Sequence, residues 1–558
     1  MNKVKELCLG VAVAGVVAGA GATVGCAVAN AEPTATDAGT SASPAQSRGH
    51  AAKSRAAITK NNDGPKSAAS TRSAAARPAA ATPRMRAVAL VPVRPAPVAI
   101  PLPFLPVPVA PASAVSVGAA ATSGRARSAS VVASAVQVAV PVHVLLIGTD
   151  GTNLSKILAD PANTGFFNLM NQSVTGATTL VGHTTISGPS WSTILTGAWD
   201  NKTGVINNIF NPKPYNSWPT AFNLLEYSNP AIDTAVVADW HYINDMAAAG
   251  GYPADTNIYV AKINDSWAET DAEVTANTID LINNTDGAAS SFIFSYQVQV
   301  DEAGHSYGGG SPEYAAAVTN VSDNIQAIMD AVAARELATG EDWTVIVTTD
   351  HGHQQSKGFG HGFQSPNETS SFIIADIAGD FTNGGKQNLG YTNADITPTI
   401  VSLFGVPLRS DFDGVPLQSD PTVLNGLVDP ANLNQALSDA ISMYGYPNIG
   451  RDIALGVRTI AGSVPYYLDI ITNTITAQLQ AIVDKQILLI STLAQGAQFA
   501  VQLTGDALVA VTQVVARAIG QLTGAGVIAP TDPPLPAPPA DSLLMQAQLP
   551  MLPAAALV

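Results

Sequence analysis

The sequence predicts an α/β domain with a mostly parallel sheet, because short apolar runs rich in β-branched residues alternate with helical stretches. Five such runs are VHVLLIG, DTAVVAD, SSFIFSYQV, WTVIVTT and SSFIIAD. Runs of this kind are typical of buried parallel strands, and we expect all five to be of that type. The longest helical stretch between them opens with Ser311, Pro312 and Glu313, as helices often do. Strand and helix in alternation predict three layers, with helices on both faces of one sheet.

Composition divides the 558 residues into segments of different character. Residues 141–425 hold most of the Asp, His and Trp and form the predicted folded domain. Residues 32–140 are rich in Ala, Pro and Ser, with few aromatic side chains to anchor a core, and we expect a disordered tether. Residues 426–528 are predicted to be a helical extension, followed by a Pro/Ala-rich tail at 529–558.

Residues 1–31 have the pattern of a secretory signal peptide. A basic start, MNKVKE, precedes an apolar run, and Ala29 and Ala31 flank a cleavage point. The pattern predicts a protein that is secreted or held in the cell envelope, with an uncleaved anchor helix as the alternative. Both cysteines, Cys8 and Cys26, lie in this segment, so the mature chain would have no disulfide and no cysteine metal ligand.

Charge is unevenly placed in a chain of net charge −16. Residues 32–140 carry 12 basic and 3 acidic residues, whereas residues 141–558 carry 12 basic and 38 acidic residues. The acidic body argues against a nucleic-acid-binding surface on the folded domain. The basic tether either holds the protein to anionic polymers of the envelope or is an inert spacer.

The helical extension has apolar residues at helical spacing and few charges. Leu468, Ile471, Ile475, Leu479 and Ile482 recur on one face. Gln, Thr and Gly interrupt each apolar stretch, which argues against a transmembrane helix. Helices packed on the domain or on a partner fit this pattern, and so does an element at a membrane surface.

Acidic and histidine residues occur where the apolar runs end, and that edge binds ligands in open α/β sheets. They are Asp150 after the first run, Asp301 and His305 in FSYQVQVDEAGH, Asp350 and His351 in VIVTTDHGH, and His361 in GFGHGF. Asp and His are ligands of zinc and manganese, so the pattern predicts a metal site at this edge. For Asp301 and His305 alone, a solvated Asp beside an unrelated His is the alternative. The other four histidines of the domain, His143, His183, His241 and His353, are assigned surface or structural roles, with His353 close enough in sequence to support the site.

A hydroxyl group precedes a predicted helix in TTISGPSWSTILTG. Ser187 comes directly before Gly188 and Pro189, so it would lie at the helix N-terminus, where free backbone amides favour a phosphorylated or alkoxide oxygen. An ordinary capping serine is the other interpretation. Thr184 and Thr185 are neighbouring hydroxyls.

In this order the motifs resemble those of the alkaline phosphatase superfamily, and most closely its nucleotide pyrophosphatase/phosphodiesterase branch, over about residues 142–420. The resemblance implies an alkaline-phosphatase-like domain with Ser187 as nucleophile and Asn208 as a donor to the phosphate. It also implies two divalent metals, with zinc as the norm and manganese as an alternative. One metal would take Asp150, Asp350, His351 and the Ser187 oxygen, and the other would take Asp301, His305 and His361.

Two residues depart from the pattern of the branch. Ser187 stands where Thr is usual, and Gly188 stands where an aromatic side chain packs on the leaving group, which puts nucleotide substrates in doubt. The implied reaction is hydrolysis of a small-molecule phosphate ester, and we expect a phosphodiester. Alternatives are a phosphomonoesterase, a sulfatase, whose signature has Arg where Trp191 stands, and a non-catalytic surface-binding module.

Overall fold

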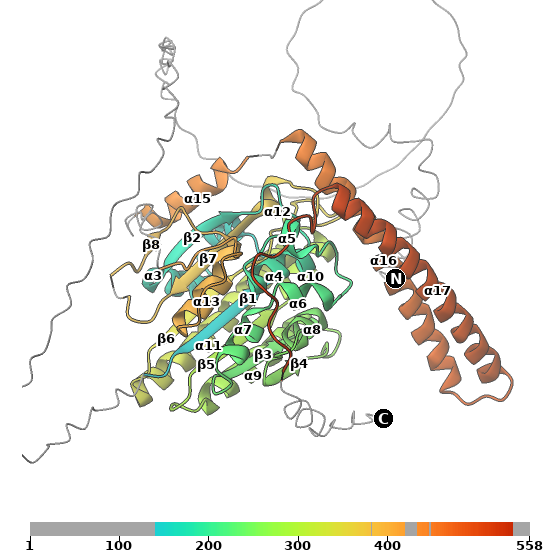
Figure 1. Ribbon diagram of the computed structural model, residues 1–558, viewed down its shortest axis with the longest axis horizontal. Helices are drawn as coiled ribbons and strands as arrows, with labels where there is room; N and C mark the ends of the chain where they lie inside the picture. The colour runs from blue at the N-terminus through green and yellow to red at the C-terminus, as the bar shows by residue number, and fades with distance from the viewer. Residues whose placement is uncertain (1–139, 381, 419–431, 446–447, 539–558) are drawn as a thin grey trace, which may run out of the picture. The chain divides into compact units, whose positions relative to one another are not determined.

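The computed structural model describes residues 140–380, 382–418, 432–445 and 448–538 (Figure 1). The predicted signal peptide, the tether up to residue 139 and the end of the tail from residue 539 lie outside the described residues. The predictions made for those segments therefore stay predictions.

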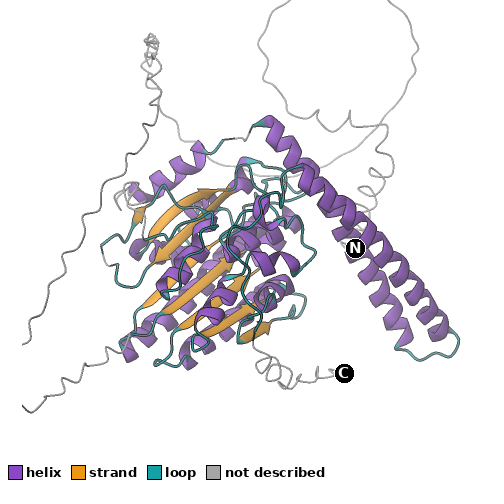
Figure 2. Ribbon diagram, in the orientation of Figure 1, coloured by secondary structure: helices purple, strands orange, loops and turns teal. Residues whose placement is uncertain are grey.

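A single eight-stranded sheet has the order β4-β3-β5-β1-β6-β7-β2-β8 (Figures 1 and 2). The strands are β1 (His143–Thr149), β2 (Val174–Thr179), β3 (Asp233–Ala238), β4 (Thr256–Tyr259), β5 (Ser291–Gln297), β6 (Trp343–Thr348), β7 (Ser370–Asp376) and β8 (Lys386–Gln387). β7 is antiparallel to both of its neighbours, β6 and β2, and every other pairing is parallel. The predicted mostly parallel sheet is confirmed.

Four of the five predicted strands are parallel as expected, but the fifth prediction is wrong. SSFIIAD forms β7, which runs antiparallel to β6. Parallel neighbours need a crossover connection, usually a helix. The chain between β6 and β7 contains one helix, α12 (Pro366–Thr369), which is too short to cross the sheet, so the chain returns in the opposite direction. This connection carries several of the predicted site residues.

Helices cover both faces of the sheet, because alternate residues of a strand face opposite sides. Val144 and Leu146 of β1 face one buried core, and Leu145 and Ile147 face the other. The first core is covered by α4 (Ser187–Thr196), α7 (Ala221–Ser228), α8 (His241–Ala248) and α13 (Ile396–Leu403). The second is covered by α2 (Leu154–Ala159), α3 (Thr164–Gln172), α9 (Trp267–Asn284), α11 (Pro312–Thr339) and α15 (Leu433–Met443). The three-layer prediction is confirmed, and the core extends past residue 425 to include α15.

Two long helices, α16 (Ile449–Val483) and α17 (Ile490–Leu522), follow the α/β domain. They form an antiparallel hairpin, since Thr476 bonds to Gln502 and Gln480 bonds to Gln498. The helical prediction for this region is confirmed. Among the described residues, α17 is the one helix that is long and apolar enough to cross a membrane, by length and composition only. The sequence argument had found no apolar stretch of this kind in the extension.

The first residues of the Pro-rich tail pack on the α/β domain. Asp532 accepts hydrogen bonds from the backbone N–H of Ser410, at 2.6 Å, and from its hydroxyl, at 2.8 Å. Leu535 packs against the first core. The part of the tail up to residue 538 is therefore attached to the domain.

Candidate active site

The predicted site residues meet at the carboxyl edge of the sheet because their strands are neighbours. β1 lies between β5 and β6, with Thr149 beside Gln297 and Gly148 beside Thr348. Asp150 directly follows β1. The helix α10 (Gln299–Tyr307) follows β5 and carries Asp301 and His305. The β6–β7 connection supplies the remaining carboxylate and imidazoles.

One candidate metal-binding group consists of Asp301, His305, His353 and His361, whose ligand atoms lie within 4.8 Å of one another. His305 Nε2 lies 3.2 Å from Asp301 Oδ2 and 3.1 Å from His361 Nε2. His353 Nε2 lies 3.1 Å from Asp301 Oδ1. Three imidazoles thus surround one carboxylate, a donor set suited to zinc.

A second candidate group consists of Asp150, Asp301 and His351, again within 4.8 Å. His351 Nε2 lies 3.8 Å from Asp150 Oδ1 and 3.2 Å from Asp350 Oδ2. Asp350 is fully buried and accepts a hydrogen bond from the backbone N–H of Gly151 at 3.1 Å. The six residues predicted as metal ligands are therefore close together, and Asp301 belongs to both groups.

The local structure around α10 places Asp301 and His305 four residues apart on one face of a helix. Gly304 lies between them, and a Cβ at this position would lie 2.4 Å from His353 Cδ2. The absence of a side chain lets His353 approach the first group.

His353 is the site residue that the sequence argument missed. It is fully buried; its Nε2 faces Asp301 Oδ1 at 3.1 Å, and its Nδ1 has no hydrogen-bond partner among the described residues. The spacing His351-x-His353 was the available signal, since alternate residues of an extended segment point to the same side. His143 and His183 do have other contacts: His143 stacks on Trp343, and His183 pairs with Asp200 at 3.0 Å.

Ser187 is the first residue of α4, and its hydroxyl faces the second group. Ser187 Oγ lies 3.2 Å from His351 Nε2, and the residue is 5% exposed. The helix offers fewer free amides than expected. Gly188 N–H donates to Asn208, Pro189 has none, and Ser190 N–H donates to Ile186. At most the amide of Ser187 remains for an anionic ligand, so the charge needed at this position must come from elsewhere.

Asn208 lies next to the candidate nucleophile, as predicted. Its Oδ1 accepts the Gly188 N–H at 2.8 Å, which leaves the amide nitrogen as the group that can donate to a ligand. A Cβ on Gly188 would lie 2.6 Å from the Asn207 carbonyl oxygen and 3.1 Å from Tyr242 Cζ. There is accordingly no room for an aromatic side chain at position 188.

The buried carboxylates have oxygen atoms that protein donors do not satisfy. Asp150 Oδ2 accepts from Trp191 Nε1 at 2.8 Å and from the Tyr296 hydroxyl, but Asp150 Oδ1 and Asp350 Oδ2 have no hydrogen-bond partner among the described residues. Buried anionic oxygens are paired or coordinate metals. No Lys or Arg of the described chain lies within 4.0 Å of Asp150, Asp301 or Asp350. The donor set therefore fits divalent cations.

The pKa shifts of the site residues also favour a bound cation. Burial, together with the charges of neighbouring aspartates, raises the pKa of Asp150 and of Asp350 well above the ordinary range. Burial lowers the pKa of His351 to about 4, so its imidazole is neutral and can act as a ligand. Burial would lower the pKa of His305 too, but the charge of Asp301 outweighs it and raises that pKa to about 9. Positive charge at this centre would reduce the electrostatic repulsion between the carboxylates.

The base of the α16–α17 hairpin contacts three segments of the site. Arg458 Nη1 donates to Asp200 and, at 3.2 Å, to the Thr184 hydroxyl just before α4. Thr459 Oγ1 donates to Gly362 O, next to His361, at 2.7 Å. Asn207 Nδ2, next to Asn208, donates to Gly462 O and to Gln513 Oε1, both at 2.9 Å. The helical extension therefore helps to hold the site loops in place.

We expect Arg458→Met to lower the free energy of unfolding at pH 7 by about 3–5 kcal/mol, because it leaves the Asp200 charge buried without its partner. Although burial opposes ionisation, hydrogen bonds and the charges of His183 and Arg458 lower the pKa of Asp200. This stabilisation is present above the ordinary Asp pKa and is lost as the pH falls through the lowered value. Chemical denaturation at pH 7 and pH 3 measures the effect, and the matched control is Arg458→Met with Asp200→Asn, which should recover stability. Equal losses at both pH values would contradict the assignment.

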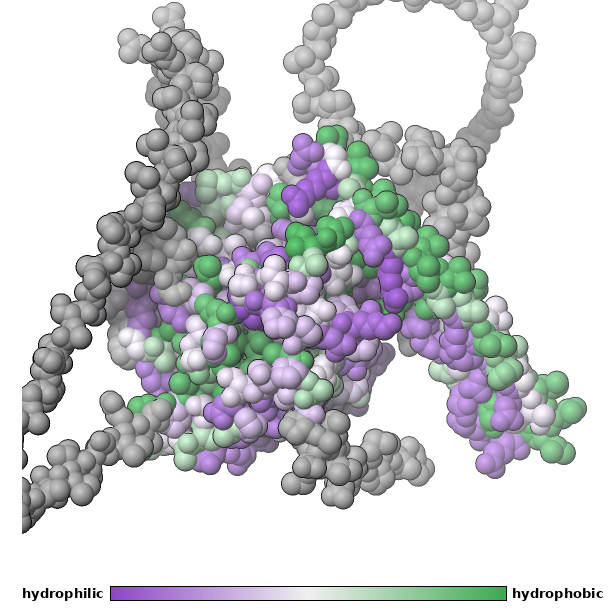
Figure 3. All heavy atoms as spheres, viewed as in Figure 1, coloured by the Kyte–Doolittle hydropathy of each residue, from purple (hydrophilic) through white to green (hydrophobic). Residues whose placement is uncertain are grey.

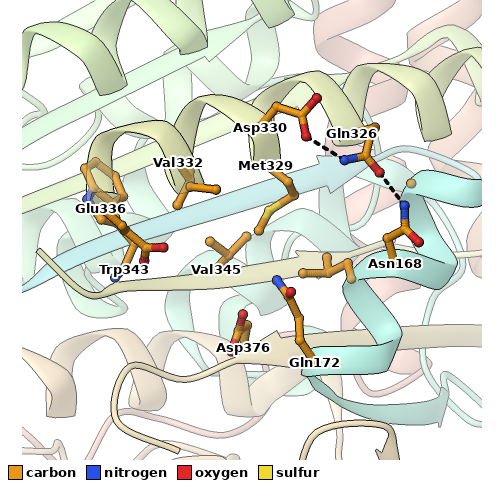
Figure 4. Close-up of a pocket in the computed structure, with 13 residues that line it drawn as sticks. Asn168, Gln172, Gln326, Met329, Asp330, Val332, Glu336, Trp343, Val345 and Asp376 are labelled. Carbon is orange, nitrogen blue, oxygen red and sulfur yellow. Dashed lines mark hydrogen bonds between the residues drawn. The ribbon is translucent and has the colours of Figure 1, made fainter. Parts of the chain in front are cut away.

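A pocket at the opposite edge of the sheet is not part of this centre (Figure 4). It lies between α3, α11, β6 and β7, and Trp343 at the start of β6 and Asp376 at the end of the antiparallel β7 line it. Asp330 and Glu336 are further lining residues, with no Lys or Arg. Asp350, by contrast, follows the end of β6.

The α/β sheet and a carboxyl edge lined by Asp and His beside a helix-terminal hydroxyl are features of a hydrolase domain with a candidate metal site. Residues 144–366 match the family described as "Type I phosphodiesterase / nucleotide pyrophosphatase", and this segment contains every predicted site residue. The resemblance seen in the motifs is confirmed by this match, as is the assignment to the hydrolases.

Solved structures with similarity to the chain include several sulfatases. A 2-O GAG sulfatase is 13% identical, with a TM-score of 0.41 over 51% of this chain and 74% of that one. A putative sulfatase from Bacteroides thetaiotaomicron is 14% identical, with a TM-score of 0.39 over 51% and 75% of the two chains. No curated protein sequence matches the chain significantly.

Proposed function

We propose that this protein hydrolyses phosphodiesters through a phosphoseryl intermediate at a centre of two divalent metal ions. One observation carries the proposal. The hydroxyl of Ser187, at the start of α4, lies 3.2 Å from His351 Nε2 and beside a cluster of buried carboxylates and imidazoles that has no Lys or Arg partner among the described residues. A nucleophile, an activating charge and a leaving-group site can therefore lie side by side.

Two ligand sets follow from this proposal. One ion would be held by Asp150, Asp350, His351 and the Ser187 oxygen. The other would be held by Asp301, His305 and His361, with His353 as a further ligand or as a group that orients Asp301. Imidazole and carboxylate donors suit zinc, and the carboxylate-rich set also accepts manganese. When bound, such ions supply the positive charge that favours an ionised serine oxygen and a departing oxygen.

In this proposal, hydrolysis of the phosphodiester has two steps. Ser187 Oγ loses its proton and bonds to phosphorus, while the bond from phosphorus to the alcohol oxygen breaks and the alcohol leaves with a proton. Water next attacks phosphorus, and Ser187 Oγ regains a proton as the phosphate monoester leaves. Asn208, whose Oδ1 is held by Gly188 N–H, donates its amide to a non-bridging oxygen, which gains charge in both transition states.

The charges around Ser187 favour a monoanionic diester over a dianionic monoester. Lys202 pairs with Asp413 at 2.7 Å, and Arg458 is bound to Asp200 and Thr523. Neither is free to meet the extra negative oxygen of a monoester. The filled space beside Gly188 further favours a leaving group that is not held by stacking, such as a lipid or polyol ester.

We expect kcat/KM to be higher for bis-nitrophenyl phosphate than for nitrophenyl phosphate, because a neutral amide donor suits a single negative charge. Asn208→Ala should lower diester turnover by about a hundredfold or more, as for loss of one oxyanion donor. Both esters and nitrophenyl sulfate are assayed on the same preparation, with Asn211→Ala, a half-buried residue nearby, as the control. A clear monoester or sulfate preference that persists in Asn208→Ala would contradict this substrate class and the role of Asn208.

We also propose that the protein is exported and associated with the cell envelope, on the basis of residues 1–31 and of the basic segment 32–140. N-terminal sequencing of exported material should give a start near Glu32. Recovery of intact protein from the cytoplasm alone would exclude this localisation.

A further inference from the structure

The outer face of α17 is apolar along most of its length. The large exposed side chains on this helix are Ile490 (52%), Leu493 (67%), Phe499 (70%), Leu503 (62%), Leu508 (48%), Val511 (63%), Val514 (65%), Val515 (51%) and Leu522 (87%). At 100° per residue these positions fall on one face about 180° wide. Figure 3 shows hydrophobic colouring along the hairpin on the side of α17.

The most deeply buried residues of the distal hairpin are small or polar. In this part, residues 470–505, the buried residues are Thr472, Ala494 and Gly505. A Cβ on Gly505 would lie 2.2 Å from Thr472 Oγ1, so the two backbones approach closely there. Small residues and hydrogen bonds between polar side chains, such as Gln498 to Gln480 at 2.9 Å, hold the two helices together. This packing is typical of helices whose outer faces meet lipid.

The charges of α17 lie at one edge of the apolar face. Asp506 and Arg517 are its two charged residues, and at 100° per residue they fall about 110° and about 90° from the centre of that face. Their opposite charges cancel, so α17 has an uncharged apolar face and a polar side without net charge. An uncharged apolar face fits the hydrocarbon boundary of a membrane, and a polar side without net charge does not require anionic lipids.

The turn of the hairpin extends the same surface. Ile487, Leu488, Leu489 and Ile490 are consecutive and between 49% and 90% exposed. The adjacent charges, Asp484 and Lys485, have opposite signs. A contiguous exposed apolar surface of this kind marks an interaction site.

We propose that the outer face of α17 and the turn of the hairpin lie in the interface of a lipid bilayer. The helix would lie along the membrane surface, with the polar flank toward water. Because Arg458, Thr459 and Gly462 at the base of the hairpin contact the loops of the candidate active site, this attachment holds that site close to the lipid surface.

The test is flotation of the full chain with vesicles of phosphatidylcholine and with vesicles that also contain phosphatidylserine, at low and high salt. We expect comparable binding to both, with little effect of salt. The triple variant Leu503→Gln/Val511→Gln/Val514→Gln should partition into vesicles at least about tenfold more weakly. The matched control, Leu337→Gln/Leu389→Gln/Leu408→Gln, removes exposed leucines of the α/β domain and should bind like the wild type.

Three outcomes would overturn the proposal. Equal flotation of the triple variant and the wild type would exclude this face. Binding restricted to anionic vesicles and lost in high salt would assign attachment to the basic N-terminal segment. A dimer detected by sedimentation, made monomeric by the triple variant and without vesicle binding, would show that a second copy covers the face. Activity on a soluble diester should be the same in all three proteins, which checks that they are folded.

Discussion

Ser187→Ala is expected to lower kcat/KM for a phosphodiester by at least about a thousandfold, because a nucleophile that bonds to phosphorus has no substitute in the variant. The loss should appear mainly in kcat, since the hydroxyl contributes to the reaction path more than to binding of the substrate. The fold should be retained, because Ser187 makes no bond that holds α4 to the sheet beyond its contact with His351. Steady-state kinetics and circular dichroism measure the two effects.

A buried serine of the same helix provides the control for this substitution. Ser190 is 2% exposed, and its hydroxyl donates to Thr184 O at 2.9 Å, away from the metal-binding groups. Ser190→Ala should retain most of the activity. Full activity in Ser187→Ala together with a large loss in Thr184→Ala or Thr185→Ala would transfer the role to a neighbouring hydroxyl. The Thr184 and Thr185 hydroxyls already donate to Asp200 and Glu368, at 3.0 Å and 3.4 Å, which favours a structural role for both.

The sequence was sufficient to place most of the site because parallel strands end at one edge of the sheet. Asp150 and the first residues after β5 and β6 had to be near one another once those strands were neighbours. The sequence did not determine that β1 lies between β5 and β6, which depends on long-range packing. The close approach of Asp150, Asp301 and Asp350 could be expected from the sequence. That Asp301 belongs to both candidate metal-binding groups could not.

Residues held by the irregular β6–β7 connection were harder to predict. His353 enters the first group only because Gly304 of α10 and Gly360 leave space for its ring, and a Cβ on Gly360 would lie 2.5 Å from His353 Cε1. The contact between Gly304 and His353 joins segments about fifty residues apart, and neither contact leaves a periodic pattern in the sequence. The same holds for Arg458, which meets Asp200 across 258 positions of the sequence. Local spacing predicts helices and strands but not which distant loop a helix supports.

Removal of bound metal is expected to abolish turnover and to lower the melting temperature by about 10 °C. Ligand binding at a thousandfold excess over Kd stabilises by about 4 kcal/mol, and a domain of this size shifts by about 2–4 °C per kcal/mol. In the metal-free protein, Asp150 and Asp350 have raised pKa values, so ionising them costs stability as the pH rises above the ordinary Asp pKa. Metal binding acts in the opposite direction, because the ligands must be deprotonated. The difference in melting temperature between the metal-loaded and chelated protein should therefore widen from pH 5 to pH 8.

Elemental analysis of variants links this stability to the two ligand groups. The wild type should contain about two metal ions per chain, as for centres with two separate ligand sets. His305→Ala should lose about one ion and His351→Ala should lose the other, because these imidazoles belong to different groups. His241→Ala, a histidine outside both groups, is the control and should retain both ions and the melting temperature of the wild type. Unchanged metal content in both His305→Ala and His351→Ala would mean that any bound ions are held outside these two groups, and the proposed two-metal hydrolysis would have to be abandoned.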